Sequence, residues 1–353
     1  MFSAGRRKFL RAAGGLGAGS LFLREARADD TTVLDSSEPR VVLPAGRCRL
    51  LVSLPKSAIA TVAILGPRDA LLGLGISGGR IANRLRKRRP LEEDGLLPRT
   101  MTVLTEDEAE TVELIVEVID PVEVVLLVAR AAEATEPTLQ GLKNGTEQAR
   151  PLIGFPVPSS DRDGYQIASA ARYVFARIDV VLSMIAAFEK TRRKFDSDAI
   201  AISDASQWDG KRPKTDINVV RHISHQGGCD VDIALPANDT FPSTLRDHCR
   251  GVRLAEDRFG CSPGTAKGVD FDRLAFLLGT FADEAPGRIN KVFLDDAYRR
   301  EVIRVAPSLH EKKLIKEAGL VALGEDGVLV ASPWHTDHVH VRFTGEKGRS
   351  LFA

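Results

Sequence analysis

The sequence predicts an α+β protein made of two units, a small β-rich, sandwich-like unit and a larger unit of helices around a central antiparallel sheet. The chain has 353 residues, which is too long for one ordinary hydrophobic core. Residues 40–130 contain short runs of β-branched residues separated by Gly, Pro and Asp, as in successive strands. From about Ile167 onward, a helical apolar period alternates with short strand-like runs.

The composition is typical of a water-soluble globular protein, with 43% hydrophobic and 27% charged residues. The formal net charge is +1, which gives no general attraction to nucleic acid or to an acidic membrane surface. We therefore expect no nucleic-acid partner.

The first 28 residues have the three-part pattern of an export signal. Arg6 and Arg7 precede a Gly- and Ala-rich apolar stretch over 12–23, and Ala26-Arg27-Ala28 is a small-x-small cleavage pattern. The paired arginines resemble a twin-arginine signal. No other stretch reaches the ~18 apolar residues that a membrane helix needs, so we expect no stable membrane span and a periplasmic location for the mature chain.

The β-rich unit is expected over residues 29–135. Val112-Glu113-Leu114 and Val116-Glu117-Val118 alternate apolar and acidic side chains, as in half-buried strands. The predicted strands are RVVLPAG (40–46), RCRLLVSL (47–54), ATVAILG (60–66), TMTVLT (100–105) and TVELIVEVI (111–119). A small sandwich accounts for this pattern.

Residues 136–163 are rich in Pro, Gly, Ser and Asp and are expected to be a linker or lead-in, with the second unit over 164–353. A long amphipathic helix is predicted over 167–194. The further predicted helices cover 271–281, 296–304 and 311–318. The predicted strands of this unit cover 199–203, 291–294, 328–332 and 338–343.

Four cysteines are present, Cys48, Cys229, Cys249 and Cys261. An oxidising compartment permits disulfides, and four cysteines allow three pairings. Cys249 and Cys261 bracket a short polar loop and are the favoured pair. Cys229 is expected to be a buried thiol or part of a disulfide.

The histidines are strongly clustered. Five of the seven lie in two short segments, His222 and His225 in the first, and His335, His338 and His340 in the second. Burying an imidazole without partners is costly, so packing alone does not explain such clusters. The alternative is a satisfied polar network without a metal.

Strand alternation places the second cluster on one face. In a strand over 338–343, His338, His340 and Arg342 point to the same side. The other side is apolar and carries Val339, Val341 and Phe343. The two histidines therefore enter one cleft.

The first cluster ends in a similar strand, in which Asp230 and Asp232 share a face. The turn over 226–228 separates His225 from this strand and allows it to fold back toward Asp232. Two imidazoles and one carboxylate, with a fourth position left for water, suit a catalytic Zn²⁺ site.

The two segments together resemble a known family. His-x-Ser-His-Gln-x-Gly-x-Asp-x-Asp-Ile (222–233) and Pro-Trp-x-x-x-His-x-His-Val-Arg (333–342) are similar to the penicillin-insensitive murein endopeptidases. These belong to the superfamily of lysostaphin-type and D-Ala-D-Ala metallopeptidases. The resemblance covers roughly residues 138–345 and excludes the β-rich unit. It implies a zinc peptidase domain that hydrolyses D-alanyl to meso-diaminopimelyl cross-links in peptidoglycan.

The resemblance also implies roles for individual residues. The zinc ligands would be His225, Asp232 and His340, and His222 and His335 match two further family histidines. The metal would activate a water and polarise the scissile carbonyl. His338 is the first candidate for the general base, because it shares a strand face with His340, and His335 is the second.

Three residues near the ligands have two interpretations each. Asp230 orients a ligand histidine or caps the turn. Arg342 binds a carboxylate of the peptide or forms a surface salt bridge. Trp334 lines the substrate groove or packs.

Two functional alternatives remain open from the sequence. One is a D,D-carboxypeptidase or dipeptidase of the same superfamily. The other is a non-catalytic, zinc-holding protein that binds peptidoglycan.

Overall fold

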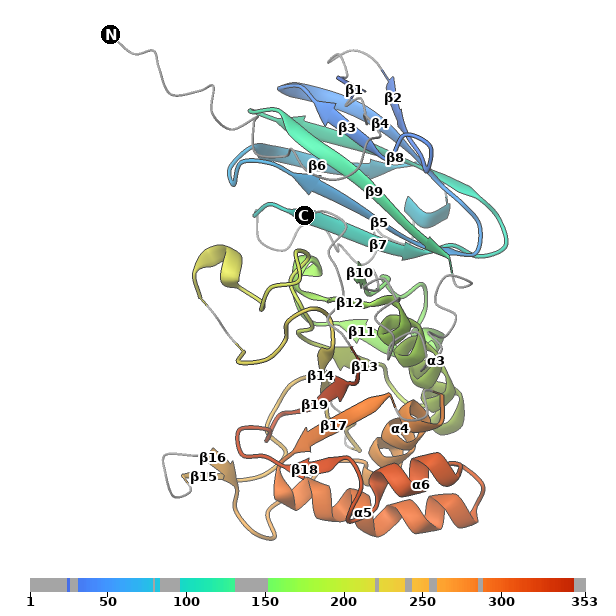
Figure 1. Ribbon diagram of the computed structural model, residues 1–353, viewed down its shortest axis with the longest axis vertical. Coiled ribbons are helices and arrows are strands. Elements are labelled where there is room, and N and C mark those ends of the chain that lie inside the picture. The colour runs from blue at the N-terminus through green and yellow to red at the C-terminus, as the bar shows by residue number, and fades with distance from the viewer. Residues whose placement is uncertain are drawn as a thin grey trace.

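The computed structural model describes residues 24–25, 31–78, 80–82, 96–130, 152–219, 222–238, 243–253, 259–284 and 288–345. Figure 1 shows a pair of β-sheets above a unit of helices and sheet. The protein is therefore of mixed α+β class. The predicted export signal lies outside the described residues apart from Arg24 and Glu25.

Two sheets form the N-terminal unit, one of five strands in the order β1-β3-β9-β5-β7 and one of four in the order β2-β4-β8-β6. In β8, Val112, Leu114 and Val116 are buried while Glu117 is exposed, as the alternation predicted. The strands are β1 (Arg24–Glu25), β2 (Thr31–Leu34), β3 (Arg40–Leu43), β4 (Gly46–Leu54), β5 (Ala58–Leu65), β6 (Leu71–Ser77), β7 (Arg99–Leu104), β8 (Glu110–Val118) and β9 (Val122–Arg130). All five predicted strands are present, and β1, β2, β6 and β9 were not individually predicted.

The second unit is organised around a six-stranded sheet in the order β11-β13-β14-β19-β17-β18. Its strands are β11 (Tyr165–Ile167), β13 (Ile200–Ile202), β14 (Asp230–Ala234), β17 (Ile289–Leu294), β18 (Leu329–Ala331) and β19 (His338–Phe343). The pairs β13·β14, β14·β19 and β17·β19 are antiparallel. Both edge pairs, β11·β13 and β17·β18, are parallel, so the sheet is antiparallel only at its centre.

Helices cover one face of this sheet. They are α3 (Ile178–Phe195), α4 (Phe271–Glu284), α5 (Asp296–Glu311) and α6 (Glu317–Leu323). Val231, Ile233, Val339 and Val341 lie in the hydrophobic core that these helices share. The alternate side chains of β14 and β19 point to the opposite face, and most of them are polar. Among the described residues, no helix is long and apolar enough to cross a membrane.

Two short sheets complete the unit. One is β10 (Leu152–Gly154) with β12 (Phe175–Arg177), and the other is β15 (Gly251–Arg253) with β16 (Phe259–Cys261). Short 3-10 turns lie at Asp161–Asp163, Ala171–Tyr173 and Thr215–Ile217.

Several predicted boundaries in this unit were wrong. The long helix begins at Ile178, because the preceding residues pair as strands β11 and β12. Of the predicted lead-in over 136–163, residues 136–151 lie outside the described residues, and the part from Leu152 onward enters the second unit as β10. Helix α5 continues to Glu311 with Pro307 inside it, and the next helix starts at Glu317.

The two units contact each other through the five-stranded sheet. Ile59, Ala63 and Val125 belong to the same hydrophobic cluster as Phe175 of the second unit. The backbone N–H of Val157 also donates to the carbonyl of Thr102 at 2.9 Å.

Candidate metal centre

The centre is built on two neighbouring strands, β14 and β19, whose polar side chains share one face. The β14·β19 register pairs Asp230 with Arg342, Asp232 with His340 and Ala234 with His338. We call these three cross-strand pairs rungs. Because side chains alternate along a strand, the rungs all project from the face opposite the core. The predicted alternation of β19 is confirmed.

The loop before β14 brings two further histidines to this face. Gly227 and Gly228 have φ values of +66° and +68°, which favour glycine. A Cβ on Gly228 would lie 2.7 Å from the backbone N of Arg177, so the close approach also requires glycine. This turn returns His225 over β14, as predicted.

Four imidazoles converge on Asp232. His225 Nε2 lies 3.2 Å from Asp232 Oδ1, and His340 Nδ1 lies 3.4 Å from the same oxygen. His222 Nδ1 lies 3.6 Å from Asp232 Oδ2, and His338 Nε2 lies 3.8 Å from Oδ1. The ligand atoms of His222, His225 and Asp232 all lie within 4.8 Å of one another, so these three residues could hold a metal ion. His340, the third predicted ligand, faces the same carboxylate.

In His222, His225 and His340, the ring nitrogen that points away from Asp232 (the outer nitrogen) donates a hydrogen bond. His225 Nδ1 donates to the carbonyl of Ala205 at 2.9 Å, and His340 Nε2 donates to Asp230 Oδ1 at 2.7 Å. The outer nitrogen of His222, Nε2, donates to Asp204 Oδ2 at 2.9 Å.

The outer bonds fix the tautomers. With its outer nitrogen protonated, each neutral ring turns a lone pair toward Asp232. Outer hydrogen bonds of this kind are the usual support of metal-ligating histidines.

The centre contains two buried polar atoms that have no hydrogen-bond partner among the described residues. These are His225 Nε2 and Asp232 Oδ1, and they are the atoms that face each other at 3.2 Å. His225 is 0% exposed and Asp232 is 2% exposed. Leaving such atoms without a partner costs about 1–3 kcal/mol each, more for a charged group. A proton on His225 or a metal ion between the two atoms would remove this cost, and the ligand atoms of His222, His225 and Asp232 are close enough to hold a metal.

The electrostatics follow from burial among opposite charges. Burial alone would raise the pKa of Asp232, but His225, His338 and His340 outweigh it and hold that pKa well below its usual range. Burial would lower the pKa of His225, yet the Asp232 carboxylate reverses this and raises it. Burial lowers the pKa of His340, against the opposing effect of Asp230.

The pKa values of His335 and His338 are shifted in opposite directions. Burial and the neighbouring His338 lower the pKa of His335 to about 4, and its Nδ1 donates to the carbonyl of Pro333 at 2.9 Å. Burial works against the charged form of His338 as well, but its bond to Asp337 outweighs this and raises its pKa. His338 Nδ1 lies 2.5 Å from Asp337 Oδ1. His335 and His338 are adjacent, with ring centroids 4.8 Å apart.

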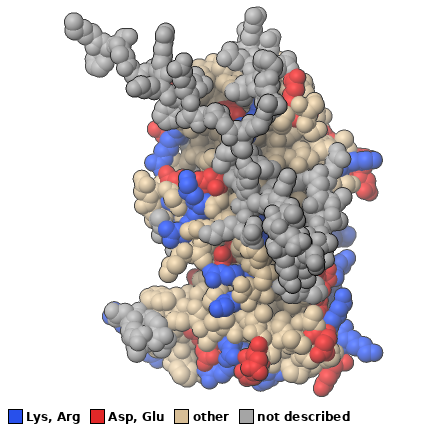
Figure 2. Space-filling model, viewed as in Figure 1, with Lys and Arg blue, Asp and Glu red and all other residues tan. Residues whose placement is uncertain are grey.

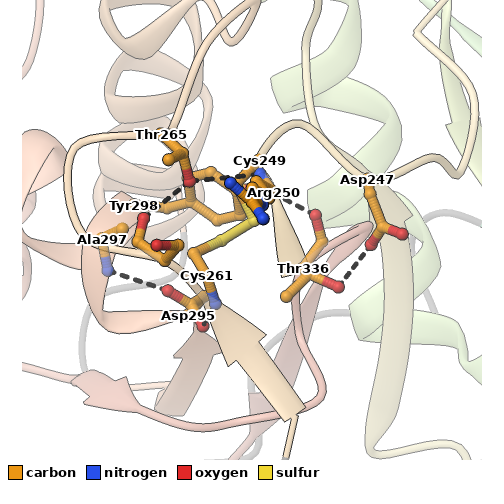
Figure 3. Close-up of a disulfide and its surroundings, with 10 residues drawn as sticks. Asp247, Cys249, Arg250, Cys261, Thr265, Asp295, Ala297, Tyr298 and Thr336 are labelled. Carbon is orange, nitrogen blue, oxygen red and sulfur yellow. Dashed lines mark hydrogen bonds between the residues drawn. A yellow bond between two sulfur atoms is a disulfide. The ribbon is translucent and has the colours of Figure 1, made fainter. Parts of the chain in front are cut away.

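A disulfide between Cys249 and Cys261 supports the segment that carries these two histidines (Figure 3). The Cys261 N–H donates to Asp295, and Asp295 also accepts from Ala297 N at the start of α5. The predicted pairing is confirmed, and Cys48 and Cys229 are buried and form no disulfide among the described residues.

Thr336, between His335 and His338, is held from two sides (Figure 3). Its hydroxyl donates to Asp247 at 2.5 Å, and its carbonyl accepts from the Tyr298 hydroxyl at 2.9 Å. The disulfide region and α5 therefore anchor the loop that enters β19.

Trp334 lies at the rim. It is 59% exposed, has a positive φ of 69°, and stacks on Phe259 of β16 with ring centroids 5.8 Å apart. The face visible in Figure 2 is indented at its left edge, where Figure 1 places the loop before β14 and the β15–β16 hairpin on either side.

The structure brings all nine predicted site residues to this region. Asp230 supports His340, as one of its two interpretations required, and Arg342 Nε donates to Asp230 at 2.6 Å. Two supporting carboxylates were missed. Asp337 is adjacent to His338 in the sequence and could have been inferred from that position, whereas Asp204 follows β13 and meets His222 only in the fold.

Comparison with known proteins gives little further information. No protein-family model and no curated protein matches the chain. Among solved structures, the chain is similar to the crystal structure of Aeromonas hydrophila PliG, a periplasmic lysozyme inhibitor of g-type lysozyme. The identity is 9% and the TM-score 0.18, over 28% of this chain and 97% of that chain. A similarity at this level does not bear on the fold or the function.

Proposed function

We propose that this protein is a zinc-dependent peptidase that hydrolyses D-alanyl to meso-diaminopimelyl cross-links in peptidoglycan. The observation that carries the proposal is the cluster of His222, His225 and Asp232, whose ligand atoms lie within 4.8 Å of one another and face His340 and His338. The motif resemblance supplies the substrate class.

The spacing of the donor atoms supports zinc. Zn–N bonds of about 2.0–2.1 Å and Zn–O bonds of about 2.0–2.2 Å at a tetrahedral angle place two ligand atoms about 3.4 Å apart. His225 and His340 have their inward nitrogens 3.2 Å and 3.4 Å from Asp232 Oδ1. His222, at 3.6 Å from the other oxygen, is a further donor. A mixed imidazole and carboxylate set suits Zn²⁺ rather than Mg²⁺ or Ca²⁺.

When bound, zinc would polarise the scissile carbonyl and lower the pKa of a water molecule. His338 is the base of this proposal because Asp337 holds its Nδ1–H and directs Nε2 toward Asp232. A carboxylate behind an imidazole stabilises the protonated ring, so His338 can accept the proton and later pass it to the leaving amine.

His335 has a different role in the proposal. With its pKa lowered by burial to about 4, it is neutral at pH 7 and is a weaker base than His338. Its Nδ1 is committed to Pro333, so only Nε2 is available to substrate or water.

The proposal also includes the location. A twin-arginine-type signal over 1–28 would export the chain to the periplasm, where peptidoglycan is accessible. Zinc-activated water as nucleophile would make the enzyme insensitive to β-lactams, because no serine or cysteine would be acylated.

Hydrolysis of defined muropeptides tests the proposal. The mature protein is incubated with purified cross-linked dimers and zinc, and the products are identified by mass spectrometry. We expect monomers to appear, and a chelator or the His340→Ala variant to abolish their formation. Cleavage of monomeric stems while dimers survive would instead indicate a D,D-carboxypeptidase or dipeptidase. Binding of murein without any hydrolysis would indicate the non-catalytic alternative.

A further inference from the structure

Arg342 occupies the rung next to the metal centre, and Asp230 and Phe293 contact its side chain. Its Nε donates to Asp230 Oδ1 at 2.6 Å, and its guanidinium carbon lies 5.2 Å from the centre of the Phe293 ring. Asp230 also accepts from His340, so the carboxylate is shared between the arginine and a predicted metal ligand. Among the described residues, this bond to Asp230 is the only hydrogen bond of the Arg342 side chain.

Arg342 also lines a cavity. The cavity has a volume of about 350 Å³ and lies over the end of β14 and β19 that is away from His338. Its lining includes Ser224, Gln226 and Asn290 beside Arg342. Ile223, on its rim, is 94% exposed. The Arg342 side chain is 33% exposed, and its two Nη groups form no hydrogen bond with the described residues.

The positive charges of Arg342 and its neighbour Lys291 favour binding of an anion. A guanidinium presents two parallel donors that match the two oxygens of a carboxylate. Lys291 of β17 pairs with Arg342 across the β17·β19 ladder and is exposed, which adds a second cation at the same level. Asp230 offsets one of the two positive charges.

We propose that Arg342 binds the carboxylate on the carbon that carries the nitrogen of the scissile amide, and so selects substrates with a free carboxylate there. The inference rests on the proposed function. In a diaminopimelyl cross-link, this nitrogen is attached to a carbon that also bears a carboxylate. Successive rungs are about 7 Å apart, two residues at ~3.4 Å each, and the arginine side chain spans part of that distance. If the scissile carbonyl lies beside Asp232 and His340, the carboxylate on the carbon attached to the amide nitrogen lies within reach of Arg342.

A matched pair of substrates isolates this contact. Cross-linked dimers with the free carboxylate and the same dimers with a carboxamide at that position are compared with wild type and Arg342→Gln. We expect wild type to have a kcat/KM roughly 10- to 100-fold higher for the carboxylate dimer, the range for a hydrogen bond between charged groups. In Arg342→Gln the ratio of the two kcat/KM values should fall to about 1, and this ratio does not depend on any change in zinc content that loss of the bond to Asp230 causes.

Two further variants serve as controls. Arg342→Lys keeps the charge without the paired donors, so part of the preference should remain. Arg304→Gln makes the same chemical change at an exposed arginine of α5 that pairs with Glu301, and should keep the full preference. Equal losses on both dimers in Arg342→Gln, or no preference in wild type, would overturn the inference.

A binding measurement separates this inference from the proposed function. If wild type hydrolyses no dimer, the proposed function fails, and the subsite is then tested with N-acetyl-D-alanine and its amide by ligand-observed NMR on the zinc-loaded protein. Preferential binding of the acid that is lost in Arg342→Gln would retain the carboxylate site. Equal binding of acid and amide would overturn it.

Discussion

Replacing Asp232 with Asn removes the carboxylate that four histidines face. The substitution keeps the shape of the side chain but removes its charge and one metal-ligating oxygen. Asp232 is 2% exposed, and it is the carboxylate whose ligand atom lies within 4.8 Å of those of His222 and His225. We expect Asp232→Asn to lose zinc almost completely.

The magnitude can be worked out from ligand linkage. A ligand present at 100 times its Kd stabilises the folded state by about 2.7 kcal/mol. For a folded unit of roughly 150–250 residues, each 1 kcal/mol shifts Tm by about 2–4 °C. Zinc should therefore raise the Tm of the chelator-treated wild type by about 5–10 °C, and that of Asp232→Asn by close to 0 °C.

The assay combines metal content after dialysis with thermal unfolding, each with and without zinc. Asp196→Asn is the matched control, because Asp196 is exposed and remote from the centre. Asp230→Asn should weaken zinc binding by about 10- to 100-fold, because it removes only the support of His340. An Asp232→Asn protein that retains one equivalent of zinc and a full thermal shift would refute the assignment of this residue as a ligand.

Three more predictions follow from the same geometry. His338→Gln should keep its zinc but lower kcat by roughly 10²- to 10⁴-fold, and an unchanged kcat on muropeptide dimers would exclude His338 as the base. The double variant Cys249→Ser/Cys261→Ser should lose about 3 kcal/mol in the free energy of unfolding in urea, since the disulfide spans 12 positions; a loss below about 1 kcal/mol would contradict this. Zinc affinity should rise as the pH increases above 6.5, because the Asp232 carboxylate outweighs burial and raises the pKa of His225 above that value. At lower pH a proton therefore occupies Nε2 and must leave when zinc binds. Calorimetry in buffers of different ionisation enthalpy measures that proton release, and a pH-independent affinity would argue against it.

The site was more predictable than the fold around it, for a physical reason. The faces of β14 and β19 follow from a period of two residues, so the positions of Asp232 and His340 could be inferred from local sequence. The return of His225 required only the turn with its two glycines. These features depend on neighbouring residues in the chain.

Features that depend on distant partners were missed. The start of α3 at Ile178 is set by β11 pairing with β13 and β12 pairing with β10, which no local pattern contains. Asp204 reaches His222 across 18 positions, and apart from following an apolar strand it has no local mark of that role. The parallel edge pairs of the sheet were likewise set by long-range topology.

The rungs on β14 and β19 also make the site a test of correct strand pairing. A slip of one residue in β19 would turn His338, His340 and Arg342 into the hydrophobic core and expose Val339, Val341 and Phe343. A misregistered chain would therefore have neither a metal site nor a stable core. Zinc would bind only to molecules in the native register, so metal uptake during refolding should report the native alignment of these two strands.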